Sequence, residues 1–302
     1  MALLAVDAGR SEVEFKSETN MGEFPSSVAS AIDLPNPALV EKDLELEIEG
    51  EKWWVGRLAQ VEGEGRERNN FGKSKADEVL KIQVLASVIY AGLAGKSIDL
   101  GLLVPIINFT DDEKLRIRKM LKGTHEVKYS LVKEFKKKPE LKETKIIIND
   151  RILISQEGAA AYWSDPQCED TQVLDFGAKT INYAYYNYDN GQSIYVNTKS
   201  STEDMGWETM KHKFSLSHKK DRNMEPEEVE KVARELAKTA IEVIDKRVKW
   251  SPDNLTQVFG GVAEQVFPYI KKKFPRAYIP NDPRNGNVIG LFNTLEEVHL
   301  HV

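Results

Sequence analysis

Residues 173–182 read V-L-D-F-G-A-K-T-I-N, the pattern of a buried strand that ends at an Asp-x-Gly turn and leads into a second strand. The same pattern stands at the start of the chain, in L-L-A-V-D-A-G-R-S. The first copy carries Asp7 and Gly9, and the second carries Asp175 and Gly177. A repeated strand–turn–strand unit fits two halves built on one plan. Either Asp-x-Gly taken alone is more often a plain surface β-turn, so the prediction depends on the rest of the chain.

The size and composition of the chain indicate a globular protein of about two domains. It has 302 residues, of which 41% are hydrophobic and 30% charged. Apolar, strand-like runs alternate with helical patterns, and this alternation predicts an α/β fold. Strands are expected at residues 3–6, 100–107, 146–148, 172–174 and 257–259, and helices at 73–95, 110–123 and 226–248. The second helix is expected to start at a capping box formed by Thr110 and Glu113.

The charge balance and the cysteine content exclude several classes of protein. The formal net charge of -6 argues against a general nucleic-acid coat. The single cysteine, Cys168, allows neither an intramolecular disulfide nor a cysteine-based zinc site, and it favours a reducing compartment. No stretch has the length of a membrane span, and the first residues lack the basic start of a signal peptide. The expectation is a cytoplasmic protein without a membrane partner.

The two Asp-x-Gly turns have the residue types that a triphosphate site requires. Glycine lets backbone N–H groups approach anionic oxygens closely, and a carboxylate can orient the water shell of magnesium. Asp7 and Asp175 stand at the mouths of these turns. The candidate phosphate-binding residues follow directly: Gly9, Arg10 and Ser11 in the first turn, and Gly177, Ala178, Lys179 and Thr180 in the second.

Two further segments carry candidate functional residues. I-S-Q-E-G-A-A-A-Y-W places Gln156 and Glu157 where a helix is expected to begin. Two interpretations of Glu157 stay open: an acidic residue stabilised by the helix dipole, or a group that positions an attacking water. F-G-G-V-A puts Gly260 and Gly261 between a strand and a helix, where the backbone can press against a base or a ribose. The chain has no Walker-type loop and no complete dinucleotide fingerprint.

Taken in order, these segments resemble the actin-like ATPases, and most closely the ParM-like plasmid-segregation actins. V-D-A-G-R-S resembles the first phosphate loop of that family, V-L-D-F-G-A-K-T-I-N the second, Q-E-G-A-A-A-Y the connecting helix and V-F-G-G-V-A the adenosine motif. N-G-N-V-I-G-L is similar to the C-terminal helix that returns to the first domain. The resemblance implies the actin-like (ribonuclease H-like) fold, in which two similar α/β domains flank a nucleotide cleft. It assigns residues 1–155 and the C-terminal helix 285–302 to domain I, and residues 156–284 to domain II.

The resemblance also implies a function. The protein would bind ATP and Mg²⁺, with GTP as the alternative nucleotide, polymerise into dynamic filaments and hydrolyse the nucleotide, with plasmid partition as its task. Asp7 and Asp175 would hold the metal through water, and Glu157 would position the hydrolytic water. The two turns would line the phosphates, and Gly260 and Gly261 would contact the adenosine. The implied partners are further copies of the chain and a DNA-binding adaptor, and direct binding to nucleic acid is not expected.

Three positions depart from the family's pattern. Glu14 stands where the first loop usually carries lysine, Asn182 where the second loop often has aspartate, and Val262 at the third glycine of the adenosine motif. The first departure removes a positive charge from the phosphate side, unless Arg10 supplies it. The departures at Glu14 and Val262 keep open an actin-like scaffold that binds nucleotide weakly. A small-molecule phosphotransferase on the same superfamily fold is the other alternative.

Overall fold

The computed structural model describes residues 1–33, 39–63, 67–68, 74–132, 139–217 and 219–301, and the chain divides into two α/β units. Unit 1 consists of Met1–Leu103, Thr110–Ile154 and Leu295–Val302. Unit 2 consists of Val104–Phe109 and Ser155–Thr294. The division by spatial contacts therefore assigns the first part of the C-terminal helix to unit 2 and its last part to unit 1. The domain limits implied by the resemblance stay a prediction.

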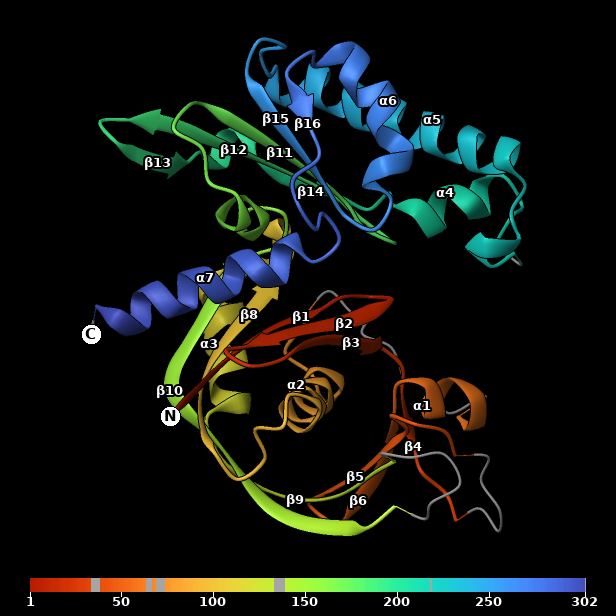
Figure 1. Ribbon diagram of the computed structural model, residues 1–302, viewed down its shortest axis with the longest axis vertical. Coiled ribbons are helices and arrows are strands. Elements are labelled where there is room, and N and C mark those ends of the chain that lie inside the picture. Colours follow the sequence, from red (N-terminus) through yellow and green to blue (C-terminus); the bar gives the residue numbers. More distant parts are fainter. Residues whose placement is uncertain (34–38, 64–66, 69–73, 133–138, 218, 302) are drawn as a thin grey trace. The chain divides into compact units, whose positions relative to one another are not determined.

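Unit 1 contains a curved sheet that encloses a helix. Helix α2, Glu78–Tyr90, contacts strands β1, β2, β4 and β6, and Figure 1 shows the sheet bending around it. Nearly every residue from Val79 to Ile89 is buried, as expected for a helix that is apolar on all sides. The strand order is β3 (Met21–Pro25), β2 (Glu12–Ser17), β1 (Ala2–Ala8), β8 (Ser97–Val104), β10 (Leu141–Gln156), β9 (Gly123–Leu131), β5 (Leu44–Ile48), β6 (Glu51–Val55), β4 (Val28–Ser30) and β7 (Glu67–Arg68). Helix α1 covers Arg57–Glu62 and helix α3 Asp111–Leu121.

Unit 2 has a sheet with hydrophobic clusters on both faces. Its strand order is β13 (Gln192–Tyr195), β12 (Ile181–Asp189), β11 (Thr171–Phe176), β15 (Leu255–Phe259) and β16 (Ala277–Tyr278), with β14 (Ser201–Glu203) also paired to β12. Leu174 and Phe176 belong to the cluster formed with helices α4 (Trp207–Lys213), α5 (Pro226–Val243) and α6 (Ala263–Lys273). Val173 belongs to the cluster around the 3₁₀ helix η2 (Ala160–Ser164). Because side chains alternate along a strand, Asp175 shares the face of Val173.

The predicted repeat of two strand–turn–strand units is confirmed. Strand β1 pairs antiparallel with β2 across the first Asp-x-Gly turn, and β11 pairs antiparallel with β12 across the second. On its other side each first strand has a parallel neighbour, β8 for β1 and β15 for β11. Asp7 and Asp175 thus lie at the carboxyl ends of parallel strands, the edge at which open α/β sheets bind their ligands.

Most of the predicted helices are present, with shifted ends. The helix expected at 73–95 begins at Glu78, because Asp77 caps it by accepting a hydrogen bond from the Leu80 N–H. Its expected first residue, Lys73, lies outside the described residues. The helix expected at 226–248 ends as an α-helix at Val243 and continues through a π-helical turn, Ile244–Val248. The sequence shows no regular pattern in residues 32–51 and 198–223. The first stretch contains β5, and the second contains β14 and α4.

The helix predicted to begin at Gln156 and Glu157 is wrong. Gln156 is the last residue of β10, and after it the chain forms only the short helix η2. Gly158 has a φ of 74°, which is incompatible with a right-handed helix. Glu157 therefore lies in a turn between a strand and a 3₁₀ helix, and the interpretation in which a helix dipole stabilises its charge loses its basis.

Helix α7, Gly286–Leu300, lies close to the backbone of this turn region. A Cβ atom on Gly290 would stand 1.9 Å from the Ala160 carbonyl oxygen, and one on Gly286 would stand 2.3 Å from the Phe259 ring. Both distances are far below van der Waals contact, so only glycine allows this approach. Among the residues that the structure describes, neither α7 nor any other helix has the length and apolarity needed to cross a membrane.

Candidate functional site

The first Asp-x-Gly turn is held by contacts to its carbonyl oxygens. Asp7 is buried at the end of β1. The Ser26 hydroxyl donates to the Arg10 carbonyl at 2.9 Å, and the Ser26 N–H donates to the Ser11 carbonyl at 2.9 Å. A Cβ atom on Gly9 would stand 2.7 Å from the Glu12 carbonyl oxygen, which explains the glycine. The turn is therefore a fixed loop.

A buried lysine that the sequence did not single out reaches this turn. Lys75 is 6% exposed, and its Nζ donates to the Ala8 carbonyl at 2.9 Å. Its position is set by Glu113, whose carboxylate accepts hydrogen bonds from the N–H groups of Lys75, at 2.6 Å, and Ala76, at 3.2 Å. The predicted capping box is consequently only half formed: Thr110 accepts from the Glu113 N–H, but the Glu113 carboxylate is used elsewhere.

Lys75 supplies a positive charge near the first turn. The resemblance implied that such a charge was missing, because Glu14 stands where the family usually has lysine. Glu14 lies on β2 directly opposite Asp7, so that the two carboxylates are cross-strand neighbours. Lys75 brings a cation to the residue that follows Asp7 in the chain. No local pattern in the sequence indicated this contact, because Lys75 and Ala8 are 67 positions apart.

Replacing Lys75 by methionine is expected to lower the free energy of unfolding by about 1–3 kcal/mol, because the buried Ala8 carbonyl loses a charged donor. Lys81→Met is the matched control: Lys81 lies on α2 and pairs with the exposed Glu49, a contact that contributes about 0–1 kcal/mol. Urea denaturation followed by tryptophan fluorescence measures both. Equal effects of the two substitutions would contradict the role given to Lys75.

The second turn is fixed by the start of α4. The N–H groups of Trp207 and Glu208 donate to the carbonyls of Gly177 and Ala178, at 3.1 and 2.8 Å. The Gly177 N–H donates to the Thr180 carbonyl at 2.9 Å, which closes the turn. The turn is therefore as firmly held as the first one.

Asp175 is buried just before this turn, within a cluster of amide side chains. Its Oδ2 accepts hydrogen bonds from the Nδ2 atoms of Asn182, at 3.1 Å, and Asn287, at 3.0 Å. Burial raises the pKa of the Asp175 carboxyl above its ordinary value of 3.8, the two amide bonds lower it, and the charge of Glu157 raises it again. Asn182, the residue that departs from the family's aspartate, is thus a direct partner of Asp175. Its own Oδ1 accepts from the Thr202 hydroxyl at 2.7 Å.

Glu157 lies near Asp175, because Asn287 bonds both to Asp175 and to Gly158, the next residue after Glu157. It is buried, and its N–H donates to the Val104 carbonyl at 2.8 Å. Two carboxylates buried in one place favour a bound cation. The hydrogen bonds from Asn182 and Asn287 both go to Asp175 Oδ2, so Oδ1 suits a hydrogen bond from metal-bound water. The donor set fits magnesium, which retains several waters and uses few protein ligands.

The segment at residues 260–261 is packed, through Gly260, against the end of strand β11. Gly260 follows β15 with a φ of 99°, and a Cβ atom on it would stand 2.3 Å from the Phe176 carbonyl oxygen. Gly261 has open space where a Cβ would be. Val262 occupies the N-cap position of α6 and offers no side-chain cap. Glu157, Asp175, the second turn and these glycines are thus brought together in unit 2, whereas Asp7, Gly9, Arg10 and Ser11 belong to unit 1.

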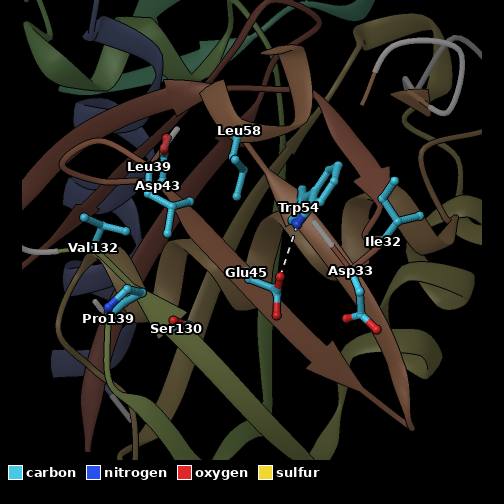
Figure 2. A pocket seen from close by; sticks show the side chains of 10 residues that line it. All are labelled: Ile32, Asp33, Leu39, Asp43, Glu45, Trp54, Leu58, Ser130, Val132 and Pro139. Atoms are coloured by element: carbon cyan, nitrogen blue, oxygen red, sulfur yellow. Dashed lines mark hydrogen bonds between the residues drawn. The ribbon is translucent and has the colours of Figure 1, made fainter. Parts of the chain in front are cut away.

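A cavity of about 190 Å³ in unit 1 lies apart from all of these residues (Figure 2). Its acidic side chains are Asp33, Asp43 and Glu45; Trp54 donates from Nε1 to Glu45 at 3.1 Å, and Arg57 pairs with Asp43 at 2.6 Å. Its described lining residues include neither a glycine nor a lysine or arginine, so it lacks the glycine turn that the candidate phosphate-binding residues form. In the described parts of the chain, no group of three or more His, Cys, Asp or Glu side chains could hold a metal by itself.

Comparison with known proteins shows what the chain is similar to. Residues 5–149 match the family model of the N-terminal domain of actin-like proteins. The archaeal actin homologue Ta0583 is 17% identical, with a TM-score of 0.76 over 98% of this chain and 100% of that one. A 15-stranded ParM filament from Clostridium botulinum is 16% identical, with a TM-score of 0.75 over 98% and 99%. An AlfA filament bound to AMPPNP is 20% identical, with a TM-score of 0.67 over 98% of each chain.

No curated protein sequence matches the chain significantly. The fold prediction is nevertheless confirmed along the length of the protein, since these structures cover nearly all of it. The chain has the actin-like fold, and its N-terminal half carries the match to the family of actin-like proteins.

Proposed function

We propose that the protein is an ATPase that binds ATP and Mg²⁺, polymerises into dynamic filaments and serves plasmid partition. The observation that carries the proposal is the pair of buried carboxylates, Asp175 and Glu157, beside a fixed glycine turn at the carboxyl end of β11. Similarity to a ParM filament and to an AlfA filament bound to AMPPNP supports both self-association and a nucleotide. The partners are further copies of the chain and a DNA-binding adaptor, and the compartment is the cytoplasm.

Each predicted residue has a role in this proposal. The backbone of Gly9, Arg10 and Ser11 and that of Gly177, Ala178, Lys179 and Thr180 binds the phosphates. Asp7 and Asp175 would orient the waters of a bound Mg²⁺, and the metal would supply positive charge to the phosphates. Glu157 orients the attacking water, and the backbone at Gly260 and Gly261 contacts the adenosine. GTP is the alternative nucleotide.

Filament formation tests the proposal directly. With ATP and Mg²⁺, the purified protein is expected to sediment as filaments, and with EDTA it is expected to stay mostly in the supernatant. The physical requirement is a head-to-tail contact between copies, which generates an open filament. Light scattering that stays flat at high protein concentration, across several salts and with ATP and GTP in turn, would refute the filament function. The phosphotransferase and the weakly binding scaffold would then become the better interpretations.

A further inference from the structure

One side chain of α7 connects two parts of the candidate site that are far apart in the sequence. Asn287 donates from Nδ2 to Asp175 Oδ2 at 3.0 Å, and its Oδ1 accepts from the Gly158 N–H at 2.8 Å. Both ends of the amide are therefore used. One partner is the buried carboxylate at the end of β11, and the other is the residue that directly follows Glu157 in the chain.

The backbone around Asn287 leaves this side chain little freedom. Gly286 and Gly290 stand one helical turn apart, and both lie where a Cβ would collide, with the Phe259 ring and with the Ala160 carbonyl respectively. Helix α7 is thus pressed against the end of β15 and against the first residue of η2. A side chain between these two contact points is held in place by close packing on either side.

The hydrogen bond from the Gly158 N–H to Asn287 acts on a residue with an unusual backbone conformation. Gly158 has a φ of 74°, and a Cβ on it would stand 2.5 Å from the Asn182 side chain. A turn of this kind has no helix hydrogen bonds to fix it. The bond from the Gly158 N–H to Asn287, together with that from the Glu157 N–H to the Val104 carbonyl at 2.8 Å, fixes the turn that presents the Glu157 side chain.

We propose that Asn287 is a positioning residue that holds the Asp175 carboxylate and the Glu157 turn in one fixed arrangement. This inference rests on the proposed ATPase function, in which Asp175 serves the metal and Glu157 the attacking water. Asn287 touches neither nucleotide nor water in this role. It acts through the two residues that do, as the outer hydrogen-bonding partners of metal ligands generally act.

Two substitutions test whether Asn287 is a positioning residue. They differ in whether the hydrogen bond from the Gly158 N–H is kept. Asn287→Ala removes both bonds, and loss of an outer partner typically slows activity about 10–100-fold. Asn287→Asp keeps an acceptor for the Gly158 N–H but sets a second carboxylate against Asp175. Both variants are therefore expected to melt at a lower temperature whatever the role of Asn287, so melting alone does not decide. A residue that merely supports α7 would leave phosphate release by the folded protein unchanged in both variants. A positioning residue would lose activity at least as strongly as with alanine.

Asn293→Ala is the matched control, since Asn293 lies on the same helix and donates to the Trp163 carbonyl at 3.0 Å. The measurements are ATP-dependent phosphate release, its half-saturating Mg²⁺ concentration, and thermal melting. We expect about 10–100-fold slower release in both Asn287 variants, a higher Mg²⁺ requirement, and near wild-type behaviour of Asn293→Ala. If the wild type and all variants release phosphate at the same rate, the role of Asn287 is refuted but the proposed ATPase function is not. Absence of ATP or GTP hydrolysis by the wild type would refute the proposed function, and the role of Asn287 with it.

Discussion

Glu157→Ala is expected to slow phosphate release by about 10²–10⁴-fold, the usual contribution of a group that orients or activates an attacking water. Nucleotide binding and filament assembly are expected to stay nearly unchanged, because the glycine turns that would bind the phosphates do not depend on this side chain. Filaments of the variant should therefore persist longer after ATP is added. Phosphate release measured in parallel with light scattering gives both quantities in one experiment.

The same substitution should not destabilise the protein through loss of a charge. The charge of Glu157 raises the pKa of the buried Asp175 carboxyl, so its removal makes ionisation of Asp175 easier. A preserved melting temperature together with slow turnover is thus the expected combination. Gln156→Ala is the control, since Gln156 ends β10 and a glutamine could also orient water. Abolished hydrolysis in Gln156→Ala with normal hydrolysis in Glu157→Ala would move the assignment by one residue.

The strand–turn–strand repeat could be predicted because it depends on local signals. A run of apolar residues that ends at Asp-x-Gly specifies a strand and a tight turn, and the structure contains both copies in equivalent pairings. The apolar run of α2 was equally clear, since a helix enclosed by a sheet has no polar face to obscure it. These features require only neighbouring residues to form.

The features that escaped prediction depend on distant contacts. The alanines after Gly158 favour a helix locally, but the packing of Gly290 on Ala160 and the positive φ of Gly158 hold the segment as a turn. Asn287 and Asp175 are 112 positions apart, so no local pattern could show that they are partners. Glu113 likewise had the spacing of a capping box, but its carboxylate is taken by the segment around Lys75.

Asp175→Asn is expected to weaken the binding of magnesium-nucleotide by about 10–100-fold while making the nucleotide-free protein more stable. The first effect follows because the variant loses the charge that orients metal-bound water. The second follows from burial, which raises the pKa of Asp175 above its ordinary value of 3.8. An asparagine at this position can still accept from Asn182 and Asn287 through its Oδ1.

The stabilisation should depend on pH with a defined sign. A carboxyl whose pKa is raised by folding binds more protons in the folded state than in the unfolded state, so the wild type loses stability as pH rises above about 3.8. The variant has no such loss. Its advantage in melting temperature should therefore be clear at pH 7 and shrink toward pH 4. Nucleotide titrations with Mg²⁺ and with EDTA complete the test, since only the Mg²⁺-dependent affinity should fall. A variant that binds magnesium-nucleotide normally and melts at a lower temperature would mean that Asp175 only shapes the turn, and the metal would have to be held by other residues.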